Sequence, residues 1–97
     1  MVVGGDTDTI AVKATLADLE RVRGRGRLVA LAAVEIVIAD LPILVSGFRV
    51  FDLGDRIAVD PPAFRDHCGR WKDAVALPGA VLTAAAELIR DALATAP

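Results

Sequence analysis

Basic side chains gather in two short stretches of this sequence. The first, RVRGRGR at 21–27, alternates arginine with valine and glycine. The second spreads basic residues over 65–72, with Phe64 and Trp71 beside them. One guanidinium group can bind two phosphate oxygens at once, and aromatic rings among cations can stack on nucleobases. Both stretches are therefore candidate nucleic-acid contacts. The candidate residues are Arg21, Arg23, Arg25, Arg27, Arg65, Arg70 and Lys72.

Each stretch also has a plainer interpretation. Gly24 and Gly26 permit a tight turn, so the arginines around them can simply keep a hairpin loop in water. Asp18 and Glu20 lie just before that loop and offset part of its charge. In the second stretch, Trp71 can belong to the core instead of to a ligand site. The residue types alone leave both interpretations open.

His67 and Cys68 form the one pair that could suggest catalysis or metal binding. Neighbouring residues in an extended loop point in opposite directions, so this pair is not a nucleophile with its base. The chain holds one histidine and one cysteine, too few for zinc without acidic ligands or a second subunit. The carboxylates show no convergent spacing, and the glycines at 24 and 26 precede a strand instead of a phosphate-binding helix. We expect no enzyme activity, catalytic residue, metal, cofactor or small-molecule substrate.

Length and composition limit what remains. A chain of 97 residues makes one domain, which we expect over 10–97 after a flexible N-terminus at 1–9. The net charge of -2 and the pI near 5.2 give no global field that attracts nucleic acid. The hydrophobic fraction is 55%, yet Glu35 and Asp40 interrupt the richest segment, so we expect no membrane span. A single cysteine excludes an internal disulfide, and the N-terminal residues do not resemble a secretory signal, so the expected location is cytoplasmic.

The richest segment in β-branched residues runs from Arg27 to Phe51 and indicates the centre of the fold. We predict two antiparallel strands, at 27–38 and 43–51, joined by a tight connection that ends with Pro42 at the start of the second strand. The first of these strands is apolar on both faces, apart from Glu35. It should therefore be covered on both sides, by a helix, a long loop or another subunit.

Shorter elements flank this centre. From Ile10 apolar and polar residues alternate, which predicts another strand, although 14–19 could also open a short helix. A further strand is expected at 56–60, a loop at 63–70 and a brief extended piece at 71–76.

A helix is predicted over 79–94, preceded by Pro78. Apolar residues recur there at helical spacing, which predicts one wide stripe that packs on the sheet. The fold class is therefore α+β, with a small antiparallel sheet of about four to five strands and a C-terminal helix. The helix residues expected to point inward are Val81, Ala85, Leu88 and Ile89.

Three stretches, taken in order, resemble the stage V sporulation protein G (SpoVG) family of bacterial septation and gene-expression regulators. SGFRVFD at 46–52 is similar to a family strand that carries Arg-Val between aliphatic residues before a glycine turn. IAVDPP at 57–62 is similar to the next strand, which ends in proline. WKDAVALP at 71–78 is similar to an aromatic-basic-Asp segment that leads to the C-terminal helix. The resemblance covers about Ile10–Ala94 and rests on order and spacing together.

The resemblance implies a homodimer joined through strands and site-preferring binding of DNA or RNA. In that family, basic residues directly after the proline contact nucleic acid, in a Pro-Ser-Lys-Arg run. The corresponding run here is Pro62-Ala63-Phe64-Arg65. Arg65 therefore inherits the contact, and Phe64 stands where the family has lysine. Lys72 occupies the basic position of the aromatic-basic-Asp segment.

Two classes of function follow. The first is a dimeric DNA- or RNA-binding regulator that acts through the two basic stretches. The alternative is a non-catalytic structural or protein-interaction module on the same fold, without nucleic-acid binding. Glu87 and Asp91 accompany Arg90 on the polar side of the helix. They favour the alternative weakly, because a helix that reads a groove would carry excess positive charge. The resemblance favours the first.

Overall fold

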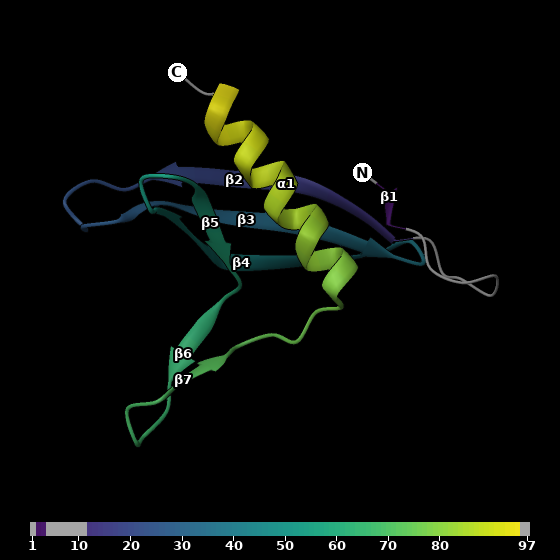
Figure 1. Cartoon of the computed structure of the whole chain (residues 1–97). Coiled ribbons are helices and arrows are strands. Elements are labelled where there is room, and N and C mark those ends of the chain that lie inside the picture. Colours follow the sequence, from purple (N-terminus) through teal and green to yellow (C-terminus); the bar gives the residue numbers. More distant parts are fainter. Residues whose placement is uncertain (1, 4–11, 96–97) are drawn as a thin grey trace.

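The computed structural model describes residues 2–3 and 12–95 as an antiparallel sheet crossed by one helix (Figure 1). The strands of the main sheet follow chain order, β1-β2-β3-β4-β5, and a second sheet pairs β6 with β7. This is the α+β architecture predicted from the sequence. The elements are β1 (Val2–Val3), β2 (Val12–Arg21), β3 (Leu28–Ile38), β4 (Leu41–Asp52), β5 (Ile57–Asp60), β6 (Ala63–Arg65), β7 (Trp71–Asp73) and α1 (Gly79–Thr95).

The central hairpin pairs β3 with β4. Its turn consists of Ala39 and Asp40 alone, and both have positive φ, 49° and 66°. Two left-handed residues in a two-residue loop match the right-handed twist of the strands on either side. The predicted connection at 39–42 is therefore too long, because the second strand already begins at Leu41. Pro42 is the second residue of that strand, close to the start where it was expected.

The stretch before the central hairpin is a strand and not a helix. β2 continues through 14–19, with a register shift between Leu16 and Asp18. Ile10, where this strand was expected to begin, lies outside the described residues. So does most of the N-terminal range at 1–9 that was predicted to be flexible. Within that range Val2–Val3 pairs with β2.

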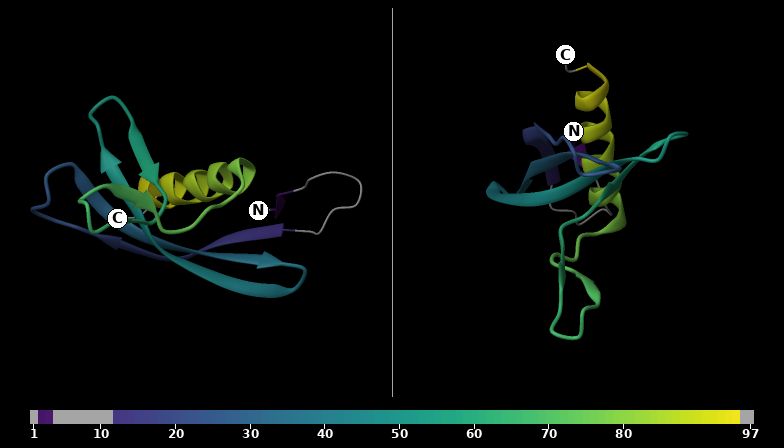
Figure 2. Two further views of the ribbon diagram at one scale, coloured as in Figure 1. Left: turned by 90° about the horizontal axis from the view of Figure 1, so that it is seen from below. Right: turned by 90° about the vertical axis from the view of Figure 1, so that its left-hand side faces the viewer.

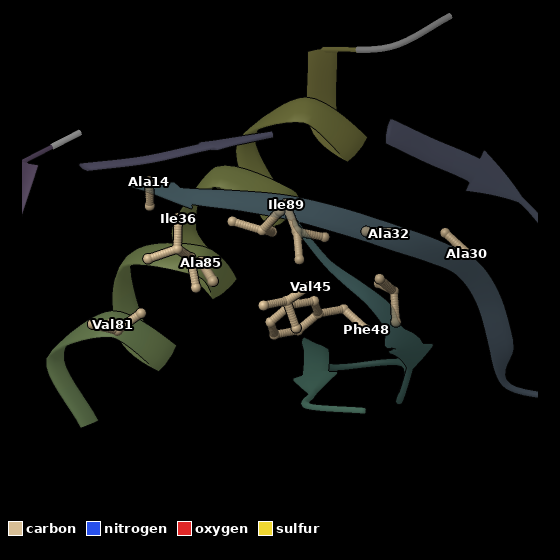
Figure 3. Close-up of a cluster of buried hydrophobic side chains, with 11 residues drawn as sticks. Ala14, Ala30, Ala32, Ile36, Val45, Phe48, Val81, Ala85 and Ile89 are labelled. Atoms are coloured by element: carbon tan, nitrogen blue, oxygen red, sulfur yellow. The ribbon is translucent and has the colours of Figure 1, made fainter. Parts of the chain in front are cut away.

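The helix α1 lies across one face of the sheet (Figures 1 and 2). Ala14 and Ala85 are both fully buried where it packs on the sheet, because side chains of one carbon let the two backbones approach closely (Figure 3). The predicted inward stripe is confirmed at Val81, Ala85 and Ile89, whereas Leu88 is only half-buried. The largest fully buried side chains come from the helix and both central strands: Phe48, Ile36, Ile89, Val34 and Val50. Each contributes about 1.5–3 kcal/mol by leaving water.

The opposite face of the sheet carries no helix among the described residues. On β3 the residues of this face alternate with the buried ones, and Leu31 is 37% exposed. Leu44 of β4, which pairs with Glu35, is 61% exposed. The described residues of one chain therefore supply no helix for this face, and its predicted cover by another subunit stays a prediction.

One edge of β4 is only partly paired. On the edge that faces away from β3, β5 pairs with Arg49–Asp52. On that same edge, no strand of the described chain pairs with residues 41–48. Leu41 and Ile43, on this unpaired length, are 63% and 40% exposed. A free edge with apolar side chains favours pairing with another strand. We call residues 41–48 the free edge.

Candidate nucleic-acid interface

Residues 63–73, which we call the ribbon hairpin, leave the main sheet after β5 and project away from it (Figures 1 and 2). The expected loop at 63–70 is partly wrong, because its first three residues form β6 and pair with β7. The register places Arg65 opposite Trp71 on one face of this two-stranded ribbon, and Phe64 opposite Lys72 on the other.

The base of the ribbon hairpin is fixed to the main sheet. The Ala74 N–H donates a hydrogen bond to the Pro62 carbonyl at 2.8 Å and closes the hairpin. Pro62 is buried against Gly47 of β4, whose φ is +95°. A Cβ on Gly47 would lie 3.5 Å from the Pro62 Cβ. That is an ordinary van der Waals distance, so glycine at this position serves the left-handed backbone and is not required by the packing of the hairpin.

Asp66 organises the turn between β6 and β7. Its Oδ1 accepts hydrogen bonds from the N–H groups of Cys68 and Arg70, both at 2.9 Å. The Asp66 N–H donates to the Arg70 carbonyl at 2.9 Å, and the Gly69 N–H donates to the Asp66 carbonyl at 3.0 Å. Its Oδ2 lies 3.4 Å from Nζ of Lys72. A short acidic side chain that accepts local N–H groups in this way holds a turn in one shape.

These contacts favour the ionised form of Asp66, whose side chain is only 12% exposed. The hydrogen bond from the Arg70 N–H is the largest cause of a lowered pKa. Partial burial works in the opposite direction, while the Cys68 N–H and the Lys72 ammonium lower the pKa further. Asp66 therefore stays charged at neutral pH and keeps the turn in place.

The structure brings three of the predicted contact residues together on the ribbon hairpin: Arg65, Arg70 and Lys72, all exposed. Nε and Nη2 of Arg65 donate to the Gly69 carbonyl at 3.4 and 3.3 Å, and its guanidinium lies 5.6 Å from the Trp71 ring centroid. Lys72 remains 60% exposed although it is paired. The Arg70 side chain contacts no partner among the described residues. The hairpin thus presents three cations from a rigid frame.

The other predicted contacts lie on residues 21–27, the arginine loop, at the turn between β2 and β3. Arg21 is at the end of β2, where its Nη2 donates to the Leu93 carbonyl of α1 at 3.1 Å. Arg23, Arg25 and Arg27 are exposed. The arginine loop and the ribbon hairpin leave the sheet in different directions, so the structure does not gather the two sets into one site (Figures 1 and 2).

Trp71 is 61% exposed, so its interpretation as a core residue is wrong. The guanidinium carbon of Arg49, on β4, lies 5.3 Å from the Trp71 ring centroid, while Arg65 approaches the same ring from β6. Arg49 also lies 5.7 Å from the ring centroid of Phe51 and 4.0 Å from Asp60 Oδ2. We call Arg49, Arg65 and Trp71 the tryptophan cluster.

Sequence reasoning missed Arg49 as a site residue. The sequence did contain a sign that Arg49 belongs to a site. Arg49 is a cation within an apolar strand, and it shares a face with Phe51, two residues away. Its approach to Trp71 could not be read from spacing, since it depends on where the ribbon hairpin meets the sheet.

His67 and Cys68 are both exposed in the turn of the ribbon hairpin. Within residues 2–3 and 12–95, no three or more of histidine, cysteine, aspartate and glutamate gather in a way that could hold a metal ion. In the same residues, no helix has the length and apolar character needed to cross a membrane.

The open face of the sheet has a shallow hollow of about 190 Å³, lined in part by Asp18, Glu20, Ser46 and Gly47. Two carboxylates line the hollow and repel phosphate, so the hollow itself is a poor surface for nucleic acid. Leu31, which also lines it, pairs with Arg49, so the acidic hollow adjoins the tryptophan cluster on the same face of the sheet.

Comparison with known proteins adds no relative to this description. The sequence matches no protein-family model, and neither a curated protein nor a solved structure matches the chain. The resemblance to the SpoVG family therefore remains a prediction from the three stretches at 46–52, 57–62 and 71–78.

Proposed function

We propose that this chain is a regulatory protein of the SpoVG type that binds DNA or RNA through its ribbon hairpin and acts as a homodimer in the cytoplasm. One observation carries the proposal. The ribbon hairpin places Arg65, Arg70 and Lys72 on a projecting two-stranded element with Phe64 and Trp71 exposed beside them. Cations on a rigid frame among exposed rings suit phosphates and bases together.

The charge distribution supports the same surface. The net charge of -2 repels nucleic acid at long range, so affinity has to come from a local excess of cations. Within the ribbon hairpin the two acidic residues are Asp66, whose oxygens are occupied by the turn and Lys72, and Asp73. Arg65 and Arg70 form no ion pair with a carboxylate among the described residues.

The proposed homodimer forms along the free edge of β4. Antiparallel pairing of two copies at residues 41–48 would satisfy the unpaired backbone groups and cover Leu41 and Ile43. A two-fold axis there gives two ribbon hairpins per dimer, which doubles the number of phosphate contacts available. Two copies of a three-cation element reach about six contacts, enough for strongly salt-dependent binding.

Binding is tested with labelled DNA and RNA of random sequence, titrated at several salt concentrations. Arg70→Ala removes a cation that contacts nothing else in the described chain, so it tests charge without disturbing the hairpin. Arg65→Ala removes the position inherited from the resemblance. We expect each change to weaken binding across all sequences and to flatten the salt slope by about one unit.

Arg56→Ala is the matched control, because Arg56 is an exposed arginine in the turn after β4 and lies outside both basic stretches. Its affinity and salt slope should equal those of the wild type. Absence of binding at low salt would contradict the proposed function. So would an affinity equal to that of the wild type in all three variants.

The dimer is tested separately by sedimentation. We expect a species of twice the 10.1 kDa chain mass, and Leu44→Lys, which places a charge beside the free edge, should shift it toward the monomer. A wild-type protein that stays at 10.1 kDa at all concentrations would exclude the dimer.

A protein-interaction module is the second candidate, and the exposed side chains near the free edge favour it. Leu41 and Leu44 are both more than half exposed, and the acidic hollow lies on the same sheet. Exposed apolar residues beside polar ones mark surfaces that bind other proteins. A dimer that forms normally and fails to bind any nucleic acid would select this candidate.

A further inference from the structure

The tryptophan cluster joins three elements around one exposed aromatic ring. Trp71 comes from β7, Arg65 from β6 and Arg49 from the main sheet, and both guanidinium carbons lie within 5.6 Å of the ring centroid. Tryptophan usually loses most of its surface to the core, because its large ring gains most from leaving water. Here the ring is 61% exposed, although two guanidinium groups contact it.

Arg49 is held by stacking more than by hydrogen bonds. Its Nε is buried and has no hydrogen-bond partner, and the Asp60 carboxylate oxygen is 4.0 Å from Nη2, beyond hydrogen-bonding distance. The contacts that remain are with the rings of Phe51 and Trp71, whose centroids lie 5.7 and 5.3 Å from the guanidinium carbon. Asp60 is half-exposed, so water weakens its attraction to Arg49. The cluster keeps an excess of positive charge beside its aromatic surface.

An exposed aromatic ring with two guanidinium groups beside it fits an unpaired nucleobase and the phosphate next to it. Bases stack on aromatic rings and on guanidinium planes, and the guanidinium groups can also bind the phosphate. In a duplex each base is stacked against its neighbours, so its face is not available to Trp71. We propose that the tryptophan cluster selects single-stranded over double-stranded nucleic acid. This inference rests on the proposed function and adds the strandedness of the ligand.

Trp71 reports on its own site, because the chain contains one tryptophan and no tyrosine. Its fluorescence is recorded while the wild type is titrated with a single-stranded oligonucleotide of mixed sequence, with a duplex of the same length, and with inorganic polyphosphate. We expect the single strand to quench Trp71 and to bind on the order of tenfold more tightly than the duplex, from stacking of one or two bases. Polyphosphate should bind without comparable quenching, because it has no base.

Variants separate the ring from the charges, with binding measured by the anisotropy of a labelled oligonucleotide. Trp71→Leu should lose about tenfold in affinity for the single strand, keep its affinity for the duplex, and keep the salt slope. Arg49→Lys retains the charge and loses the planar guanidinium group, so it should also reduce the preference for the single strand, as Trp71→Leu does. Arg56→Lys is the control, because Arg56 is an exposed arginine in the turn after β4, outside the tryptophan cluster, and should leave the preference unchanged.

Three outcomes are distinct. Equal affinity for both forms with unquenched Trp71 overturns the inference and leaves the proposed function standing. Equal quenching by polyphosphate and by the single strand overturns it as well, because the cluster would then be an anion site. Absence of binding to any nucleic acid contradicts the proposed function itself. Circular dichroism of each variant checks that the fold is retained.

Discussion

The arginine loop carries four arginines within seven residues, whereas the ribbon hairpin carries three basic residues within eleven. The arginine loop, which has the higher density of cations, is the less organised of the two hairpins. Its turn is closed by backbone hydrogen bonds, such as the Leu28 N–H to the Arg25 carbonyl at 3.2 Å, and it contains no aromatic residue. In the ribbon hairpin, Asp66 fixes the turn and Trp71 lies beside Arg65.

The difference teaches that the number of cations does not decide which hairpin binds. A flexible arginine loses conformational freedom when it contacts a ligand, and this loss opposes binding. Arg65 has lost part of that freedom before any ligand arrives, because the Gly69 carbonyl and the Trp71 ring already restrict it. The sparser hairpin is therefore the better candidate for specific contact.

The largest expected effect removes the scaffold that both hairpins share. Ile89→Asp places an unpaired carboxylate at a fully buried position of α1 and should cost several kcal/mol of unfolding free energy. Both hairpins should lose their ordered NMR signals together. Thr83→Asp, at an exposed position near the start of the same helix, is the control and should melt like the wild type. An unchanged melting temperature in Ile89→Asp would mean that α1 does not pack as described.

A smaller effect should separate the hairpins. Gly47→Ala forces a side chain into a left-handed backbone beside Pro62 and should cost about 1–2 kcal/mol, with increased amide exchange in the ribbon hairpin. Gly26→Ala, in the arginine loop, has a φ of +63° and open space around it. That φ lies in the left-handed region that other residues can adopt, whereas the +95° of Gly47 lies outside it, so Gly26→Ala should lower the denaturant midpoint less. Equal exchange rates in both hairpins of Gly47→Ala would contradict this.

Acid should loosen the ribbon hairpin alone. Because the folded pKa of Asp66 is lowered, the turn gains stability above the ordinary aspartate pKa and loses it as the pH falls through the lower, folded value. We expect the amide signals of Cys68 and Arg70 to broaden or shift in that acidic window, while those of the arginine loop stay constant. In Asp66→Asn the same signals should not titrate. A parallel response of both hairpins would point to general acid unfolding.

The smallest expected effect lies in the arginine loop. Changing Arg23, Arg25 and Arg27 together to glutamine should alter unfolding free energy by no more than about 0.5 kcal/mol, because all three are exposed. Arg21 is left in place because it donates to Leu93 at the end of α1. Affinity for nucleic acid should fall less in this triple variant than in Arg70→Ala, measured at the same low salt. A larger fall would reverse the ranking of the two hairpins.

Periodicity predicted the large elements. The β-branched residues predicted the two central strands, alternation predicted β2, and the spacing from Val81 to Ile89 predicted α1, because each pattern extends over many residues. The two-residue β1 was not predicted. β6 and β7 have three residues each, too few to show a repeat, and β6 was taken for a loop. The turn at Ala39 was placed too broadly, because alanine rarely adopts positive φ and gives no turn signal.

The candidate site was predictable in part. Arg65, Arg70 and Lys72 were found from charge, and they do share one hairpin. The exposure of Trp71 was not predictable, because a tryptophan beside apolar residues in the sequence is compatible with a buried and with an exposed position. Arg49 is far from Trp71 in the sequence, and the two meet only through the packing of the ribbon hairpin against the main sheet.

The chain-order pairing of the main sheet also has a consequence for protein synthesis. Each strand pairs with its neighbour in sequence, so the hairpins can form as they leave the ribosome, while α1 emerges after all of them. Until then the apolar face with Val34, Ile36 and Phe48 is built without its cover. The nascent chain is therefore most prone to aggregate in the interval between β4 and α1, and a chaperone that shields this face would act there.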